Sequence, residues 1–218
     1  MSLERISLPV YTKKEELYNS LSHFVGIPLG IAALVVLLLK AIAPSSILGA
    51  SIFSLSIVVL YTCSTLYHSL KPSNAKKFMR TIDHSVIFIM ISGTTIPLAL
   101  ICVYPYAPIF AIVSVLFSLI VSTVGIALTM IDQDKYRVAK MVLYMVVGWA
   151  ASILVFPIYK YCDNALLIIG LIALGGIVYT VGTVFLKLGQ TKKYFHAIFH
   201  GFVLLGTILH IAAIYIAI

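Results

Sequence analysis

Apolar residues run along this chain in seven long stretches that are separated by short polar segments. Each stretch reaches or exceeds the roughly 20 residues that an α-helix needs to cross a hydrocarbon core about 30 Å thick. A membrane β-barrel would instead show segments of about 10 residues that alternate between apolar and polar. The pattern therefore predicts an all-α membrane protein with seven transmembrane helices, at residues 21–39, 47–70, 82–104, 109–131, 139–158, 165–186 and 195–218.

Composition agrees with this pattern, because 61% of the residues are hydrophobic and only 10% are charged. A soluble domain carries about 25% charged residues, so a soluble protein is excluded. The sequence Ala41-Ile42-Ala43 resembles a signal-peptide cleavage site. However, the apolar run before it is longer than the 7–15 residues of a signal peptide. The short loops leave no room for a further domain, and we expect residues 1–218 to form one domain.

The basic residues are distributed unevenly between the two sides of the predicted helices. Only Lys40 and Lys160, of the 15 Lys and Arg residues, fall on one side. The other side holds Arg5, Lys13, Lys14, Lys71, Lys76, Lys77, Arg80, Lys135, Arg137, Lys140, Lys187, Lys192 and Lys193. The positive-inside rule therefore predicts a multi-pass protein of the cell membrane with a cytoplasmic N-terminus and an extracellular C-terminus. Juxtamembrane lysines that face anionic lipid explain the net charge of +8, and no basic, aromatic-rich loop indicates nucleic-acid binding.

A few ionisable residues lie at the predicted cytoplasmic ends of the helices, where they suggest a metal site. His68 falls in the last turns of the second helix, and His196 and His200 open the seventh. Histidines at i and i+4 can bind one ion, and a catalytic zinc typically has three protein ligands and a water. Asp83 opens the third predicted helix, where it would bond that water or orient an imidazole. Ser64 lies on the same helix face as His68.

A second polar stripe lies on the first helix, where Glu16, Asn19 and His23 are spaced i, i+3 and i+7. We expect these residues to support the metal site by hydrogen bonding, with His23 competing for a ligand role. A simpler interpretation also exists for each group. Histidines at helix ends can lie at the headgroup level, Asp83 can cap its helix, and the stripe can be a solvated helix start.

Two further histidines are expected to lie outside the ligand set. His84 points about 100° away from Asp83 around the helix. His210 lies roughly 21 Å from His196 along the helix axis, and we expect it to line a cavity or to pair with a hydroxyl group of another helix.

These residues give the chain a resemblance to the haemolysin III group of the progestin and adipoQ receptor (PAQR) family. The resemblance covers nearly the whole chain. It rests on Glu16-x-x-Asn19-x-x-Ser22-His23, Ser64-x-x-x-His68, Asp83-His84-Ser85, Gly175-Gly176-x-x-Tyr179-Thr180-x-Gly182 and His196-x-x-x-His200. The chain departs from the family pattern at Ser92–Pro97, and at Phe199 where many members have tryptophan.

The resemblance implies seven helices with the N-terminus inside, and a zinc ion held by residues matching His68, His196 and His200. In the adiponectin receptors of this family, a water bridges the zinc to the residue matching Asp83, and the residue matching Ser64 lies nearby. Those receptors resemble alkaline ceramidases. The expected activity is therefore hydrolysis of a membrane lipid amide or ester, in support of membrane homeostasis. Zinc would activate a water, Asp83 would act as general base, and Ser64 would donate to the oxyanion.

Two other classes of function remain open. A membrane sensor or receptor would use zinc structurally, and a closed fourth coordination position would favour it over an enzyme with an exchangeable water. A haemolysin-like pore would need a continuous polar path, whereas the outer halves of the helices carry mainly Ser, Thr and Tyr. The sequence gives no signal for the oligomeric state.

Overall fold

A computed structural model describes residue 4 and residues 6–218, and within them it is helical, with no strand. Arg5, one of the basic residues of the N-terminal tail, lies outside the described residues. The elements are α1 (Lys13–Phe24), α2 (Gly26–Lys40), α3 (Pro44–Ser69), α4 (Asn74–Leu98), the π-helical η2 (Ala99–Val103), α5 (Pro108–Asp132), α6 (Arg137–Trp149), the 3₁₀ segment η3 (Ala150–Leu154), α7 (Val155–Tyr161), α8 (Ala165–Leu188) and α9 (Phe195–Ala217).

These elements form seven helices that are long and apolar enough to cross a membrane, which confirms the predicted fold class. Two of the helices begin well before their apolar stretches do. The first starts at Lys13 because Thr12 and Glu15 form a capping box, and α4 starts at Asn74 because the Ser73 hydroxyl accepts from the Lys76 N–H at 3.2 Å. Hydropathy alone therefore placed these helix starts too late.

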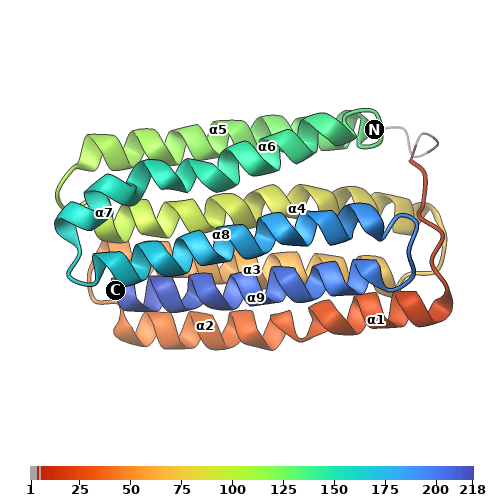
Figure 1. The fold of residues 1–218 in the computed structure, drawn as a ribbon, viewed down its shortest axis with the longest axis horizontal. Helices are drawn as coiled ribbons and strands as arrows, with labels where there is room; N and C mark the ends of the chain where they lie inside the picture. The colour runs from red at the N-terminus through yellow and green to blue at the C-terminus, as the bar shows by residue number, and fades with distance from the viewer. Residues whose placement is uncertain (1–3, 5) are drawn as a thin grey trace.

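The helices lie side by side in one bundle, with the start of α1 and the C-terminus at opposite ends (Figure 1). One end of the bundle holds the starts of α1, α4 and α9 and the C-terminal end of α3, and we call it the histidine end. The side of the membrane that this end faces is a prediction of the charge pattern.

The helix α4 is the most enclosed of the seven. In the most apolar part of the span from Asn74 to Val103, 78% of the residues are buried, compared with 44% in α3. Asp83 lies on the same helix, nearer the histidine end, and is partly buried. A charged group at this depth requires polar neighbours from the packed helices.

The residues ahead of α1 form a strap, residues 6–12, that crosses the histidine end from the α5–α6 side to α1 (Figure 1). The N–H and the hydroxyl of Ser7 donate to the Asp134 carboxylate at 3.0 and 2.9 Å. Arg80 on α4 donates to the same carboxylate at 2.9 Å and to the Ser7 carbonyl at 2.8 Å. Burial of the Asp134 carboxyl favours its neutral form, but the Ser7 N–H and the Arg80 charge prevail and lower its pKa.

Candidate metal centre

Three histidines from two helices that are far apart in the sequence meet at the histidine end. His68 comes from the last turn of α3, and His196 and His200 come from the first turns of α9. One nitrogen of each ring lies within 4.8 Å of the other two, and the ring centroids are 4.6 to 5.2 Å apart. This spacing lets one metal ion contact all three rings after small rotamer adjustments, given Zn–N distances of about 2.1 Å.

Hydrogen bonds to the second nitrogens fix the direction in which two of the rings point. The Nδ1 of His68 lies 2.8 Å from the Glu16 carboxylate, and its Nε2 is buried with no partner among the described residues. The Nδ1 of His200 donates to the Asn19 carbonyl at 3.1 Å and to the Ser22 hydroxyl at 2.9 Å. Because these acceptors take the Nδ1 protons, each Nε2 keeps its lone pair for the centre of the cluster.

Glu16 connects His68 to a buried lysine. Its second carboxylate oxygen accepts from the Lys76 ammonium group at 2.7 Å, and that group also donates to the Leu70 carbonyl at 2.8 Å. Lys76 is only 2% exposed, so it does not face anionic lipid as the charge pattern suggested. The Ser73 cap places Lys76 in the first turn of α4, where it neutralises the carboxylate that orients His68.

We expect the Glu16→Gln variant to bind zinc about 10- to 100-fold more weakly, the usual cost of removing an outer-shell carboxylate. The amide retains an acceptor but loses the charge that makes the His68 ring more basic. Competition with a chromophoric chelator measures this affinity. Asp163→Asn is the matched control, since it removes the same charge from an exposed carboxylate in the loop before α8, at the opposite end of the bundle. Equal affinities of the two variants would contradict the role assigned to Glu16.

The other two residues of the predicted α1 stripe contact His200. Asn19 does so through its backbone carbonyl, while its buried side-chain amide has no partner within the described part of the chain. The His23 ring stacks on the His200 ring at 3.5 Å between centroids and meets the edge of Tyr61. His23 lies outside the group of three histidines whose nitrogens come within 4.8 Å of one another. Both of its ring nitrogens are buried without a partner among the described residues, and its role as a support for the centre stays a prediction.

Asp83 and Ser64 lie together beside this group. Asp83 is the tenth residue of α4, so the alternative in which it caps the helix is wrong, and Ser73 does the capping. The Ser64 hydroxyl is buried next to the Asp83 carboxyl, although not in hydrogen-bond geometry with it. The Asp83 carboxylate does not belong to the ligand group formed by the three histidines.

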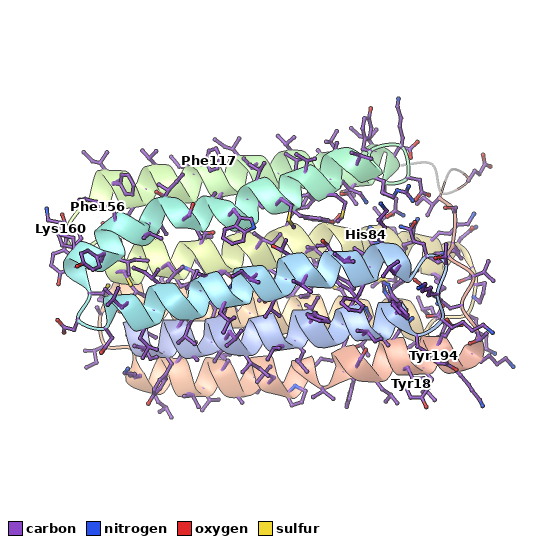
Figure 2. All side chains as sticks on the ribbon, viewed as in Figure 1. Tyr18, His84, Phe117, Phe156, Lys160 and Tyr194 are labelled. Carbon is purple, nitrogen blue, oxygen red and sulfur yellow. The ribbon has the colours of Figure 1, made fainter. Side chains whose placement is uncertain are left out.

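The remaining histidines have other partners. The His84 Nδ1 accepts from the Lys140 ammonium group at 3.1 Å, on the α6 side of α4. Figure 2 shows His84 toward the histidine end and Lys160 at the opposite end. Lys140 is 2% exposed and lies within α6, so it does not face anionic lipid as the charge pattern suggested. The Nε2 of His210 lies 3.3 Å from the Ile172 carbonyl of α8. The partner of His210 is therefore a backbone carbonyl and not the hydroxyl group that was expected.

Sequence reasoning missed Tyr11. Its ring lies on the strap, 5.5 Å from the His196 ring and 6.1 Å from the His68 ring between centroids. Burial, with the nearby Glu16 charge, raises the pKa of the Tyr11 phenol, so its hydroxyl stays protonated. The only signal for this residue in the sequence is its position just ahead of the Thr12 cap.

Comparison with known proteins identifies the family of this chain. The sequence model of the family described as "Haemolysin-III related" matches residues 11–211, a range that contains every residue of the centre. The "Hemolysin-3 homolog" of Bacillus subtilis (strain 168) is 34% identical over 206 residues, covering 91% of this chain and 92% of the relative. "Hemolysin-3" of Bacillus cereus is 30% identical over 198 residues, covering 89% and 87%. The human "Monocyte to macrophage differentiation factor" is 26% identical over 174 residues, covering 76% and 68%. The chain therefore belongs to the haemolysin-III related family, and it is a multi-pass membrane protein.

Proposed function

We propose that this protein is a zinc-dependent hydrolase that cleaves amide or ester bonds of membrane lipids and thereby contributes to membrane lipid homeostasis. The observation that supports it best is the state of the His68 ring. One nitrogen of this ring is bonded to Glu16, and the other is buried, unpaired within the described chain and directed at two more histidines. A buried polar atom without a partner calls for an explanation, and a bound ion is one of them; the two further histidines that face this nitrogen favour that explanation.

The donor set fits zinc better than other common ions. Imidazole nitrogens suit zinc and its neighbours among the transition metals, whereas magnesium and calcium prefer oxygen donors. Three protein ligands leave a fourth position open, as in catalytic rather than structural zinc sites. Glu16 for His68, and Asn19 with Ser22 for His200, supply the hydrogen bonds that hold metal-binding imidazoles in one tautomer.

Zinc at this position would supply Lewis-acid chemistry, activating a water and polarising an acyl carbonyl. The side chains beside it have the properties that hydrolysis requires. Asp83 carries a carboxylate that lies outside the ligand group and is able to accept a proton as general base. The Ser64 hydroxyl, which lies next to it, is a donor for the oxygen that gains charge during attack.

The location of the centre indicates a lipid substrate. His196 and His200 occupy the first turns of a helix that is long and apolar enough to cross a membrane, so they would lie near the depth where lipid acyl carbonyls meet the headgroups. Large apolar side chains such as Leu17, Leu21 and Ile198 are exposed on the outer faces of α1 and α9 near this end, and they would face acyl chains. We therefore expect acyl amides and esters of membrane lipids as substrates.

Removal and return of the metal tests this proposal. The protein is purified in detergent without added zinc, its metal content is measured by elemental mass spectrometry, and fatty-acid release is followed from a panel of acyl-amide and acyl-ester lipids. We expect about one zinc per chain, hydrolysis that stops on treatment with a chelator, and recovery with zinc. A folded protein without metal would contradict the proposal. Bound zinc without hydrolysis of any lipid in the panel would favour the sensor function instead.

A further inference from the structure

The strap presents a single aromatic ring to the histidine centre. The Tyr11 ring is half-buried and lies within 5.5 and 6.1 Å of the His196 and His68 rings between centroids. The other described neighbours of the three histidines come from within the bundle, among them Glu16 and Tyr67 beside His68, Asn19, Ser22 and His23 beside His200, and Phe199 beside His196. Tyr11 is therefore the residue that reaches the centre from outside the helices, at the end where it faces the aqueous phase.

Both ends of the strap are fastened to helices that surround the centre. At one end, the backbone and side chain of Ser7 are bonded to Asp134, between α5 and α6, and to Arg80 on α4. At the other end, the Glu15 carboxylate accepts from the N–H and the hydroxyl of Thr12 at 2.9 and 2.8 Å. Two fastenings five positions apart, at Ser7 and Thr12, leave the intervening segment little freedom to move away from the bundle.

Glu15, which bonds Thr12, also bonds the residue directly before α9, the helix that carries His196 and His200. The other oxygen of Glu15 accepts from the Tyr194 N–H at 3.3 Å, and Tyr194 takes a left-handed conformation with φ of 65° directly before α9. The Tyr194 ring packs edge-on against Tyr18 of α1 at 5.6 Å between centroids, and both lie near the strap in Figure 2. The position of Tyr11 is thus coupled to the start of α9 and to His196.

We propose that the strap is a lid, in which the Tyr11 ring covers the histidine centre and restricts exchange of the metal with the aqueous phase. The identity of the metal rests on the proposed function, but the lid rests on the contacts of Tyr11 alone. A covered centre favours substrates that arrive from the bilayer over substrates that arrive from solution. The lid opens when the Ser7–Asp134 fastening breaks.

Zinc release provides the first test. Zinc-loaded protein is mixed with a chromophoric chelator and the rate of metal transfer is recorded. We expect Tyr11→Ala to release zinc about tenfold faster, and Asp134→Asn to accelerate release in the same direction, because each removes a restraint on local opening. Tyr11→Phe keeps the ring and should behave as the unchanged protein does. Tyr159→Ala, which removes an exposed tyrosine from α7 at the opposite end, is the matched control.

Two outcomes of this test would overturn the lid. Release from Tyr11→Ala at the rate of the unchanged protein would show that the ring does not cover the centre. Equal acceleration in Tyr11→Phe and Tyr11→Ala would show that the hydroxyl, as a metal ligand, restrains the ion instead of the ring. Should Tyr11→Ala fail to fold, the zinc-release rate of Asp134→Asn tests the lid, since this variant leaves every residue of the centre in place. An unchanged rate in Asp134→Asn would reject the lid.

A second measurement does not depend on metal. Metal-free protein is treated with diethyl pyrocarbonate, and the modified histidines are identified by peptide mass spectrometry. We expect faster modification of His196 in Tyr11→Ala and Asp134→Asn than in the unchanged protein, with His210 unaffected in all. Equal modification rates would reject the lid. An unchanged protein that holds no zinc but shows the expected modification pattern would reject the proposed function and retain the lid.

Discussion

Replacing His196 and His200 together by alanine is expected to lower the zinc content of the purified protein from about one ion per chain to background. These two histidines supply two of the three ligand nitrogens from neighbouring turns of one helix. His68 would remain as the sole imidazole of the group, and a single neutral nitrogen cannot hold zinc against the water and buffer around it. The loss should be complete rather than graded.

Elemental mass spectrometry of protein purified without added metal measures this effect. His210→Ala is the matched control, because it removes the same side chain from the same helix at a position that bonds the Ile172 carbonyl. That variant should keep its zinc. Thermal unfolding in detergent gives an independent readout, since added zinc should stabilise the unchanged protein and leave the double variant unaffected. Zinc retained by the double variant would place the metal elsewhere in the chain.

Replacing Asp83 by asparagine is expected to reduce lipid hydrolysis by about 10²- to 10⁴-fold, the usual contribution of a general base, and to leave the zinc content unchanged. Asparagine keeps the size of the side chain but cannot accept the proton of a water. Because the Asp83 carboxylate lies outside the group of three histidine nitrogens, its loss removes no ligand. Retention of metal with loss of turnover would therefore separate proton transfer from metal binding.

This comparison is made on zinc-loaded protein, with the lipid that the unchanged protein hydrolyses fastest. Asp163→Asn makes the same chemical change in an exposed residue of the loop before α8, and it should retain full activity. Turnover preserved in Asp83→Asn would exclude this residue as the base. Loss of zinc together with turnover would instead make Asp83 part of the ligand set.

The sequence alone determined the membrane architecture. A helix in lipid satisfies its backbone hydrogen bonds internally, so an apolar stretch of sufficient length leaves one structural solution. Local periodicity also determined that His196 and His200 share a face of α9, because an i, i+4 spacing has the same meaning in any helix. Helix starts were less predictable, since Thr12 with Glu15 and Ser73 extend α1 and α4 beyond the apolar residues.

Tertiary structure decided which polar residues meet. Residues near helix ends look alike in sequence whether they face headgroups or protein, and the packing of the seven helices separates the two cases. That packing brings Glu16 to His68 and buries Lys76 against Glu16, although the charge pattern suggested that Lys76 faces anionic lipid. The position of Tyr11 depends on how the strap crosses the histidine end of the bundle. Contacts between residues so far apart in the chain arise from helix packing, and no local period encodes them.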